Sequence, residues 1–167
     1  MVYQTKPEKA VFKLLLEKQL TLAAAESCTG GLIAERMTNL PGASNAFMGG
    51  VVSYTNTVKA NVLGVAQTLL DEHGAVSEPV ARAMAEGVRQ VTGADLGVSV
   101  TGVAGPASDD RGNPVGTVYV ALATGDGTVC RLCQFGKRAR VRIRGHAADT
   151  AFDMVRQYLE GRADKTH

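Results

Sequence analysis

Residues 95–103 constrain the fold of this chain more than any other segment. They are rich in valine and glycine and carry no charge after the first residue, Asp95. A strand with one solvated face alternates apolar and polar residues, whereas a strand buried on both faces is apolar almost throughout. This segment therefore predicts a central strand that is covered by helices on both sides of its sheet.

The rest of the chain alternates between helical and extended patterns. Helical spacing with start and stop signals predicts helices over residues 7–18, 32–39, 55–64, 66–73, 77–93 and 139–160. For the first of these, Thr5 is expected to be the N-cap, with Glu8 three residues later completing a capping box. Strands are expected over residues 21–25, 47–54, 95–103, 117–124 and 128–135, and Gly125-Asp126-Gly127 is typical of a hairpin turn between the last two.

The order of these elements predicts one α/β domain over residues 1–167. Its expected architecture has three layers, α/β/α, on a mixed and mostly parallel sheet that is closed by a C-terminal β-hairpin and a long last helix. In such sheets ligands bind beyond the carboxyl ends of the strands. Residues 26–31, 54–59 and 101–106 each follow or end a strand, so we expect them to meet at one edge of the sheet.

Composition and charge exclude several classes of protein. The net charge of +2 gives no overall signal for nucleic acid, and no apolar run approaches the roughly 18 residues that span a membrane. Because the N-terminus lacks a signal-peptide core, a cytoplasmic protein is expected. The three cysteines form no disulfide framework, and Cys130 and Cys133 should point to opposite faces of one strand. No second cysteine pair or nearby histidine completes a zinc set, so no metal site is predicted.

The turn between the first strand and the second helix concentrates reactive side chains. It holds Glu26, Ser27, Cys28, Thr29, Gly30 and Gly31. Such a turn points backbone N–H groups and the positive end of a helix dipole at any ligand above it. Two interpretations stay open: ordinary helix capping by Ser27 or Thr29, and a nucleophile in a binding site. Glu26 would either hold the turn through backbone N–H groups or orient a ligand.

A serine nucleophile requires a base, and Lys59 is the residue placed to provide it. The histidines lie in two predicted helices and in the tail, not at strand ends, at positions His73, His146 and His167. A buried lysine can lose its proton and act as a base, and Tyr54 could relay a proton or orient the amine. The alternative is a solvated Lys59 beside an edge aromatic residue. Cys28 is a rival nucleophile, since a thiol near a helix N-terminus can have a lowered pKa.

Two further segments suggest an anionic ligand. Residues 101–105 form a glycine-rich loop that fits neither the nucleotide triphosphate nor the dinucleotide motif but can present N–H groups to an anion. Residues 137–144 (KRARVRIR) hold five basic residues. Arg138 and Arg142, four residues apart, would share a helix face suited to a phosphate, whereas Arg140 and Arg144 should face solvent. A phosphate ligand is favoured over nucleic acid, because this cluster stands alone without interleaved aromatic residues.

These motifs together resemble the CinA C-terminal domain family, whose enzymatic members are nicotinamide mononucleotide amidohydrolases. The resemblance runs from about residue 5 to residue 159 in matching order and spacing. It is carried by residues 25–32 (AESCTGGL), 50–59 (GVVSYTNTVK) with 63–65, 101–106 (TGVAGP) with 113–118 (NPVGTV), and 135–138 (FGKR) with Arg142. Residues 107–110 depart from the family, in which further glycines often follow Gly-Pro.

The resemblance implies a Ser–Lys dyad that hydrolyses the carboxamide of nicotinamide mononucleotide to nicotinic acid mononucleotide and ammonia. Ser27 would be the nucleophile and Lys59 the general base, with Tyr54 beside them, and no metal or cofactor would be needed. N–H groups of residues 29–31 or of Gly102 would bind the oxyanion. Thr29 would then be the helix cap. The substrate contacts are expected from Glu26, Thr29, Gly30, Gly31, Asn56, Thr101, Gly102, Gly105, Arg138 and Arg142.

The resemblance implies that the chain is the stand-alone form of the family and that it binds a small nucleotide. A homo-oligomer, most simply a dimer, is expected because small α/β enzymes commonly form one. Neither nucleic acid nor membrane is an expected partner. The alternative function is a non-catalytic module that senses a nucleotide or binds a partner in a setting linked to competence or DNA damage. A sensor would need the phosphate contact but not both Ser27 and Lys59.

Overall fold

The computed structural model describes residues 5–164 and is built on one five-stranded sheet of order β2-β1-β3-β4-β5. The strands are β1 (Leu22–Glu26), β2 (Phe47–Val52), β3 (Leu96–Gly102), β4 (Thr117–Thr124) and β5 (Gly127–Gln134). β1 pairs in parallel with β2 and β3, whereas β3–β4 and β4–β5 are antiparallel. The predicted mixed sheet with a C-terminal hairpin is confirmed, with the central strand where the apolar segment 95–103 placed it.

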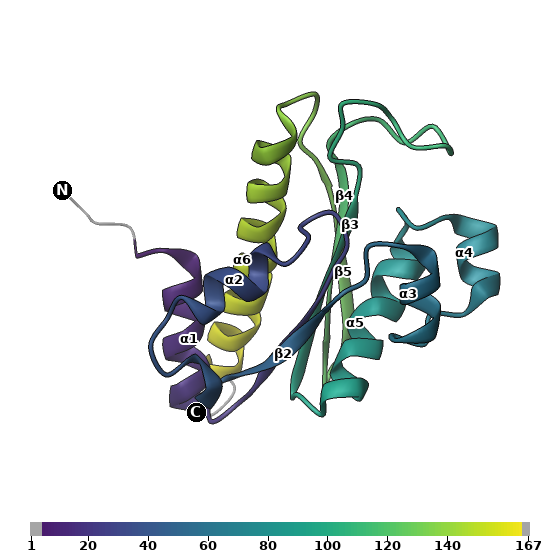
Figure 1. Ribbon diagram of the computed structural model, residues 1–167. Coiled ribbons are helices and arrows are strands. Elements are labelled where there is room, and N and C mark those ends of the chain that lie inside the picture. Colours follow the sequence, from purple (N-terminus) through teal and green to yellow (C-terminus); the bar gives the residue numbers. More distant parts are fainter. Residues whose placement is uncertain (1–4, 165–167) are drawn as a thin grey trace.

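Helices cover both faces of this sheet and complete the predicted three layers (Figure 1). One face carries α1 (Pro7–Lys18), α2 (Leu32–Thr38) and α6 (Arg140–Asp164). The other carries α3 (Asn56–Asn61), α4 (Gln67–His73) and α5 (Glu78–Thr92), and a short 3₁₀ turn, η1 (Ala43–Asn45), precedes β2. No helix in the described part of the chain is long and apolar enough to cross a membrane.

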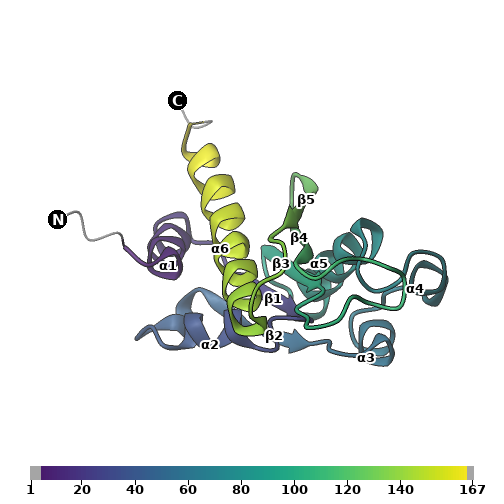
Figure 2. The ribbon, with the colours of Figure 1, turned by 90° about the horizontal axis from the view of Figure 1, so that it is seen from above.

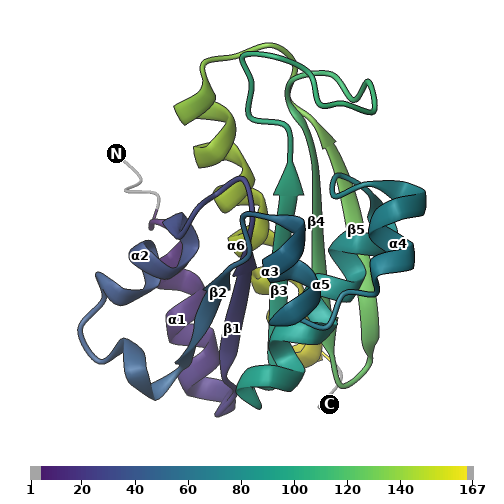
Figure 3. The same cartoon turned by 45° about the vertical axis from the view of Figure 1, so that its right-hand side comes forward.

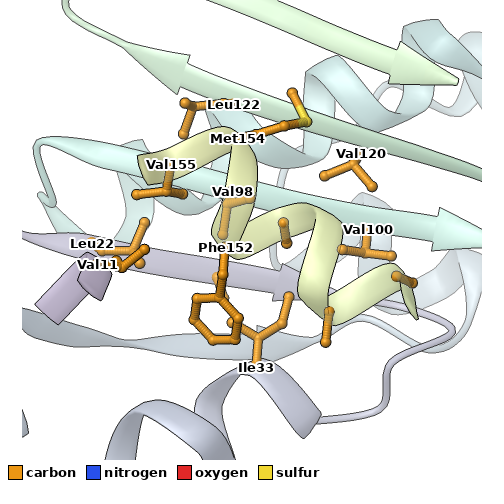
Figure 4. Packing of buried hydrophobic residues seen from close by; sticks show 14 of the residues in the cluster. Val11, Leu22, Ile33, Val98, Val100, Val120, Leu122, Phe152, Met154 and Val155 are labelled. Atoms are coloured by element: carbon orange, nitrogen blue, oxygen red, sulfur yellow. The ribbon is translucent and has the colours of Figure 1, made fainter. Parts of the chain in front are cut away.

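The main core lies between α6 and the sheet (Figure 4). It includes Val98 and Val100 of β3, Val120 and Leu122 of β4, and Phe152, Met154 and Val155 of α6. On the opposite face α5 lies so close to β3 that a Cβ on Gly97 would come 2.3 Å from the carbonyl oxygen of Ala85. A glycine in β3 is therefore required by the close approach of a helix.

Cys130 and Cys133 lie on opposite faces of β5, as their spacing predicts. Cys130 packs against a cluster of four alanines between α5 and the sheet, and Cys133 packs against the main core between α6 and the sheet. Both thiols are free. This pair therefore contributes to packing on two separate faces.

The predicted cap of α1 is wrong. The N-cap is Lys6, one residue after Thr5, and no side chain bonds to the free N–H groups there. Glu8 instead forms an ion pair with Arg36 of α2, at 2.7 Å, and Arg36 also stacks over the ring of Phe152. The Glu8 carboxylate thus forms a nearly buried ion pair between α1 and α2 instead of the hydrogen bond of a local capping box.

Candidate active site

Ser27 and Lys59 meet at the carboxyl end of the parallel strands. Ser27 directly follows β1, and Lys59 lies in α3, which the chain enters soon after the neighbouring strand β2. The Nζ atom of Lys59 is 3.0 Å from the Oγ of Ser27 and donates to the carbonyl oxygen of Ser53 at 2.7 Å. Adjacent parallel strands bring their ends together, which explains why residues 32 positions apart are in contact.

The environment of Lys59 favours its neutral form. Its side chain is only 1% exposed, and no carboxylate among the described residues forms an ion pair with it. Burial lowers the pKa of Lys59 to about 8. In the neutral form the Ser27 hydroxyl can donate to Nζ while the amine keeps its bond to Ser53. The pair can then act as nucleophile and base.

Glu26 holds the turn rather than facing the ligand. Its carboxylate accepts bonds from the backbone N–H groups of Ile33 and Ala34, at 2.8 and 3.1 Å, and the residue is 1% exposed. These N–H groups belong to the first turn of α2, where a carboxylate also complements the helix dipole. Of the two roles left open by the sequence, the structure shows the structural one.

The expected capping by Thr29 is wrong. The N-cap of α2 is Gly31, at φ +104°, and Gly30 before it is also left-handed, at φ +57°. These two glycines separate Thr29 from the helix, and Glu26 satisfies the N–H groups that a capping hydroxyl would have bonded. The Thr29 Oγ1 is buried without a hydrogen-bond partner among the described residues.

Cys28 is a poor nucleophile in this fold. Burial raises the pKa of Cys28 to about 12, the opposite of the lowered value that a helix N-terminus would have given. The nearby Arg144 donates to the backbone carbonyls of Cys28 and Thr29 at 3.0 and 2.9 Å. Its guanidinium therefore bonds to the main chain of this turn and not to the Cys28 thiol. The thiolate is therefore scarce at neutral pH.

The dyad opens into a cleft of about 330 Å³. Seven predicted site residues line it, namely Ser27, Tyr54, Asn56, Lys59, Thr101, Gly102 and Gly105. Glu26, Thr29, Gly30 and Gly31 lie outside this lining, in the turn that positions Ser27. The Tyr54 hydroxyl accepts a bond from Arg140 at 2.8 Å and makes none to Lys59 or Ser27.

The arginines of the last helix are arranged in the reverse of the expected way. α6 begins at Arg140, so Arg138 lies in the preceding turn, where its Nε donates to the carbonyl of Phe135 at 2.9 Å. Arg142 is exposed, and neither residue lines the cleft. Arg140 does line it and donates to the Gly105 carbonyl at 2.6 Å. The buried Ile143 turns the Arg140–Arg144 side toward the dyad and the Arg142 side outward.

The cleft lining also includes residues that were not expected as substrate contacts, although Val103 and Ala104 belong to the segment 101–106 that was expected at this edge. Val103, Ala104, Ala107 and Asp109 come from the loop between β3 and β4, and Ala75 and Val76 from the α4–α5 connection. The length of the first loop was a usable signal, whereas nothing in the sequence marks the second. His73 and His146 lie in α4 and α6 and do not line the cleft, and His167 lies outside the described residues.

Comparison with known proteins places the chain in a family. A family model described as the CinA C-terminal domain matches residues 4–159. The chain belongs to the CinA C-terminal domain family. The resemblance inferred from the dyad and glycine motifs is thereby confirmed.

Named CinA relatives are similar over nearly the whole chain. A competence-damage inducible protein of Desulforudis audaxviator is 51% identical over 158 residues, which cover 94% of this chain and 38% of that protein. This chain therefore spans less than two fifths of that relative.

Solved structures of competence-damage inducible proteins have the same fold as this chain. The competence/damage inducible protein CihA of Agrobacterium tumefaciens has a TM-score of 0.86 at 34% identity, over 96% of this chain and 99% of that one. The competence damage-inducible protein A of Klebsiella pneumoniae has a TM-score of 0.89 at 30% identity, over 92% and 95%. The three-layer fold predicted for this chain is thus that of solved CinA structures.

Proposed function

We propose that this protein is an amidohydrolase that converts nicotinamide mononucleotide into nicotinic acid mononucleotide and ammonia. The observation that carries the proposal is the 3.0 Å contact between the Ser27 hydroxyl and a buried lysine amine of lowered pKa, at a cleft. A buried amine without a carboxylate partner is costly to a fold. Its contact with a serine at a cleft is typical of an activated nucleophile.

The reaction would proceed by acyl transfer. Ser27 Oγ attacks the carboxamide carbon while Lys59 takes the hydroxyl proton, and Lys59 then gives that proton to the departing ammonia. Water next attacks the ester carbon, with Lys59 accepting its proton, and the returning Ser27 oxygen is protonated as the nicotinate product leaves. One lysine serves as base and acid in turn, which requires a pKa near the working pH.

Backbone N–H groups beside Ser27 can bind the oxyanion. Ser27 N–H donates to the Val100 carbonyl and Gly30 N–H to the Ser27 carbonyl, so neither is available. The N–H groups of Cys28 and Thr29 donate to no backbone carbonyl among the described residues and follow directly after the nucleophile. We assign them this role, which is worth about 3 kcal/mol per donor in known hydrolases.

Arg140 is suited to hold the substrate phosphate. Among the described residues it is the one arginine that lines the cleft, and its two terminal nitrogens donate to the Gly105 carbonyl and the Tyr54 hydroxyl. A guanidinium presents five N–H donors, so donors remain for a phosphate. We assign this contact to Arg140 in place of Arg138 and Arg142.

The proposal is tested by ammonia release from nicotinamide mononucleotide, with nicotinic acid mononucleotide identified as the second product. Equal amounts of both products are expected. Binding of the nucleotide without release of ammonia would contradict the proposal and favour the non-catalytic sensor. For that alternative, the competence-damage names of relatives supply the setting only.

The rate should depend on pH through Lys59. Because burial lowers its pKa to about 8, kcat/KM should rise about tenfold per pH unit below that value and level off above it. The folded state binds fewer protons here than the unfolded state, in which the pKa is near the ordinary 10.5, so this group's contribution to stability also rises with pH between these values. Initial rates from pH 6 to 9 check this, and a profile that is flat or falling would contradict it.

A further inference from the structure

One wall of the cleft is a loop without helix or strand. Residues 103–116 connect β3 to β4 and extend toward α4, as Figures 2 and 3 show. Five of its residues line the cleft, namely Val103, Ala104, Gly105, Ala107 and Asp109. A binding wall made of loop keeps its shape only if it is fastened to rigid elements.

Arg111 fastens this loop to α4. Its guanidinium donates to backbone carbonyls of the last turn, those of Leu70 at 3.5 Å, Asp71, and Glu72 at 2.9 Å. The Leu70 carbonyl also accepts the Gly74 N–H at 2.9 Å, whereas the carbonyls of Asp71 and Glu72 lie at the helix end, where intrahelical donors run out and a cation is favourable. Gly74 follows α4 at φ +74°, and a Cβ on it would lie 2.6 Å from the Arg111 Cδ. The glycine therefore leaves the space that the arginine stem occupies.

Hydrogen bonds within the loop connect Arg111 to Asp109, which lines the cleft. The Asp109 carboxylate accepts bonds from the backbone N–H of Arg111 at 3.1 Å and of Asn113 at 2.7 Å. It also accepts one from the Asn113 side chain at 2.8 Å. The cleft residue Asp109 is thus held in a closed turn with the residue that anchors the loop.

A second wall of the cleft, next to α4, is held by two further hydrogen bonds. Ala75 and Val76 line the cleft and lie in the connection between α4 and α5, outside any helix or strand. The Thr101 hydroxyl donates to the Ala75 carbonyl at 2.8 Å, and the Asn113 amide to the Val76 carbonyl at 3.5 Å. Arg111 therefore joins the loop to the last turn of α4, and Asn113 joins it to the α4–α5 connection that follows, whereas Ser27 and Lys59 belong to other elements.

We propose that Arg111 is a positioning residue that sets the width of the cleft for the substrate. This inference rests on the proposed function for its kinetic consequence. Arg111 touches neither Ser27 nor Lys59 in this structure and acts through the loop. Its removal should therefore impair substrate binding more than the chemical step.

The test compares Arg111→Ala, Arg111→Lys and the control Arg89→Ala. Arg89 also donates to a backbone carbonyl, that of Asp95 at 2.8 Å, and lies outside the cleft lining. For nicotinamide mononucleotide, R111A should raise KM about tenfold and leave most of kcat. R111K should restore part of the affinity, because lysine keeps the cation at the helix end but not the fork of donors. R89A should match the wild type.

Amide hydrogen exchange without substrate supplies a readout independent of activity. R111A should accelerate amide exchange in residues 103–116 and 74–77 and leave the amides of β1 and α3 protected. If R111A does not fold, the same measurement is made on R111K. The inference would be overturned if R111A and R111K both exchanged their loop amides at the wild-type rate, or if R111A lowered kcat and left KM unchanged. If the wild type releases no ammonia, the proposed function fails, and the exchange comparison still decides whether Arg111 holds the loop.

Discussion

Ser27→Ala should reduce ammonia release by at least about a thousandfold, because removal of a nucleophile leaves only oxyanion binding and substrate positioning. Nucleotide binding should persist, since Arg140 and the cleft loops do not depend on the hydroxyl. The measurement is kcat with nicotinamide mononucleotide, together with a binding titration of the variant. The substitution removes one oxygen from a buried site, so the fold should be retained.

Cys28→Ala is the matched control for this variant. It changes the adjacent side chain and keeps the backbone N–H that we assign to the oxyanion. Since burial raises the pKa of Cys28 to about 12, its thiolate contributes nothing at neutral pH and C28A should keep most of the rate. Loss of activity in C28A with activity retained in S27A would move the nucleophile to the thiol.

Lys59→Met should abolish turnover to a similar extent, on the order of a thousandfold or more, because Ser27 then has no base. The variant should be at least as stable as the wild type, because methionine fills similar space without a buried amine that lacks a carboxylate partner. Thermal unfolding and kcat, measured on the same sample, check the two expectations together.

Lys59→Arg separates a base from a fixed positive charge. Arginine keeps the charge beside Ser27 but does not lose its proton at any working pH, so it cannot accept the serine proton. We expect K59R to be as inactive as K59M. Substantial activity in K59R would mean that the position needs a cation only, and the dyad mechanism would be wrong.

The meeting of Ser27 and Lys59 could be predicted because it depends on topology. Two adjacent parallel strands end at the same edge; Ser27 directly follows β1, and Lys59 lies in the short helix α3 that follows β2. Tyr54, Asn56 and the glycine-rich loop reach the cleft for the same reason. Patterns of apolar residues and turn signals are sufficient to locate strand ends, so this part of the site follows from sequence.

The side-chain environment could not be predicted in the same way. Which arginine faces the cleft depends on where α6 begins and on the burial of Ile143, and a shift of two residues exchanges the two faces. That Glu26 and not Thr29 accepts the N–H groups of the first turn of α2 depends on two left-handed glycines, which place the Thr29 hydroxyl away from the helix. The raised pKa of Cys28 follows from packing, which a local motif does not reveal.

The most direct test of the central claim is the site of the acyl group during turnover. The protein is mixed with nicotinamide mononucleotide, quenched in acid within milliseconds and digested, and the peptide that contains residues 25–31 is fragmented in the mass spectrometer. The dyad predicts the mass of the nicotinate mononucleotide acyl group on Ser27 in the wild type and its absence in S27A. An acyl group on Cys28, or on a residue outside this turn, would contradict it.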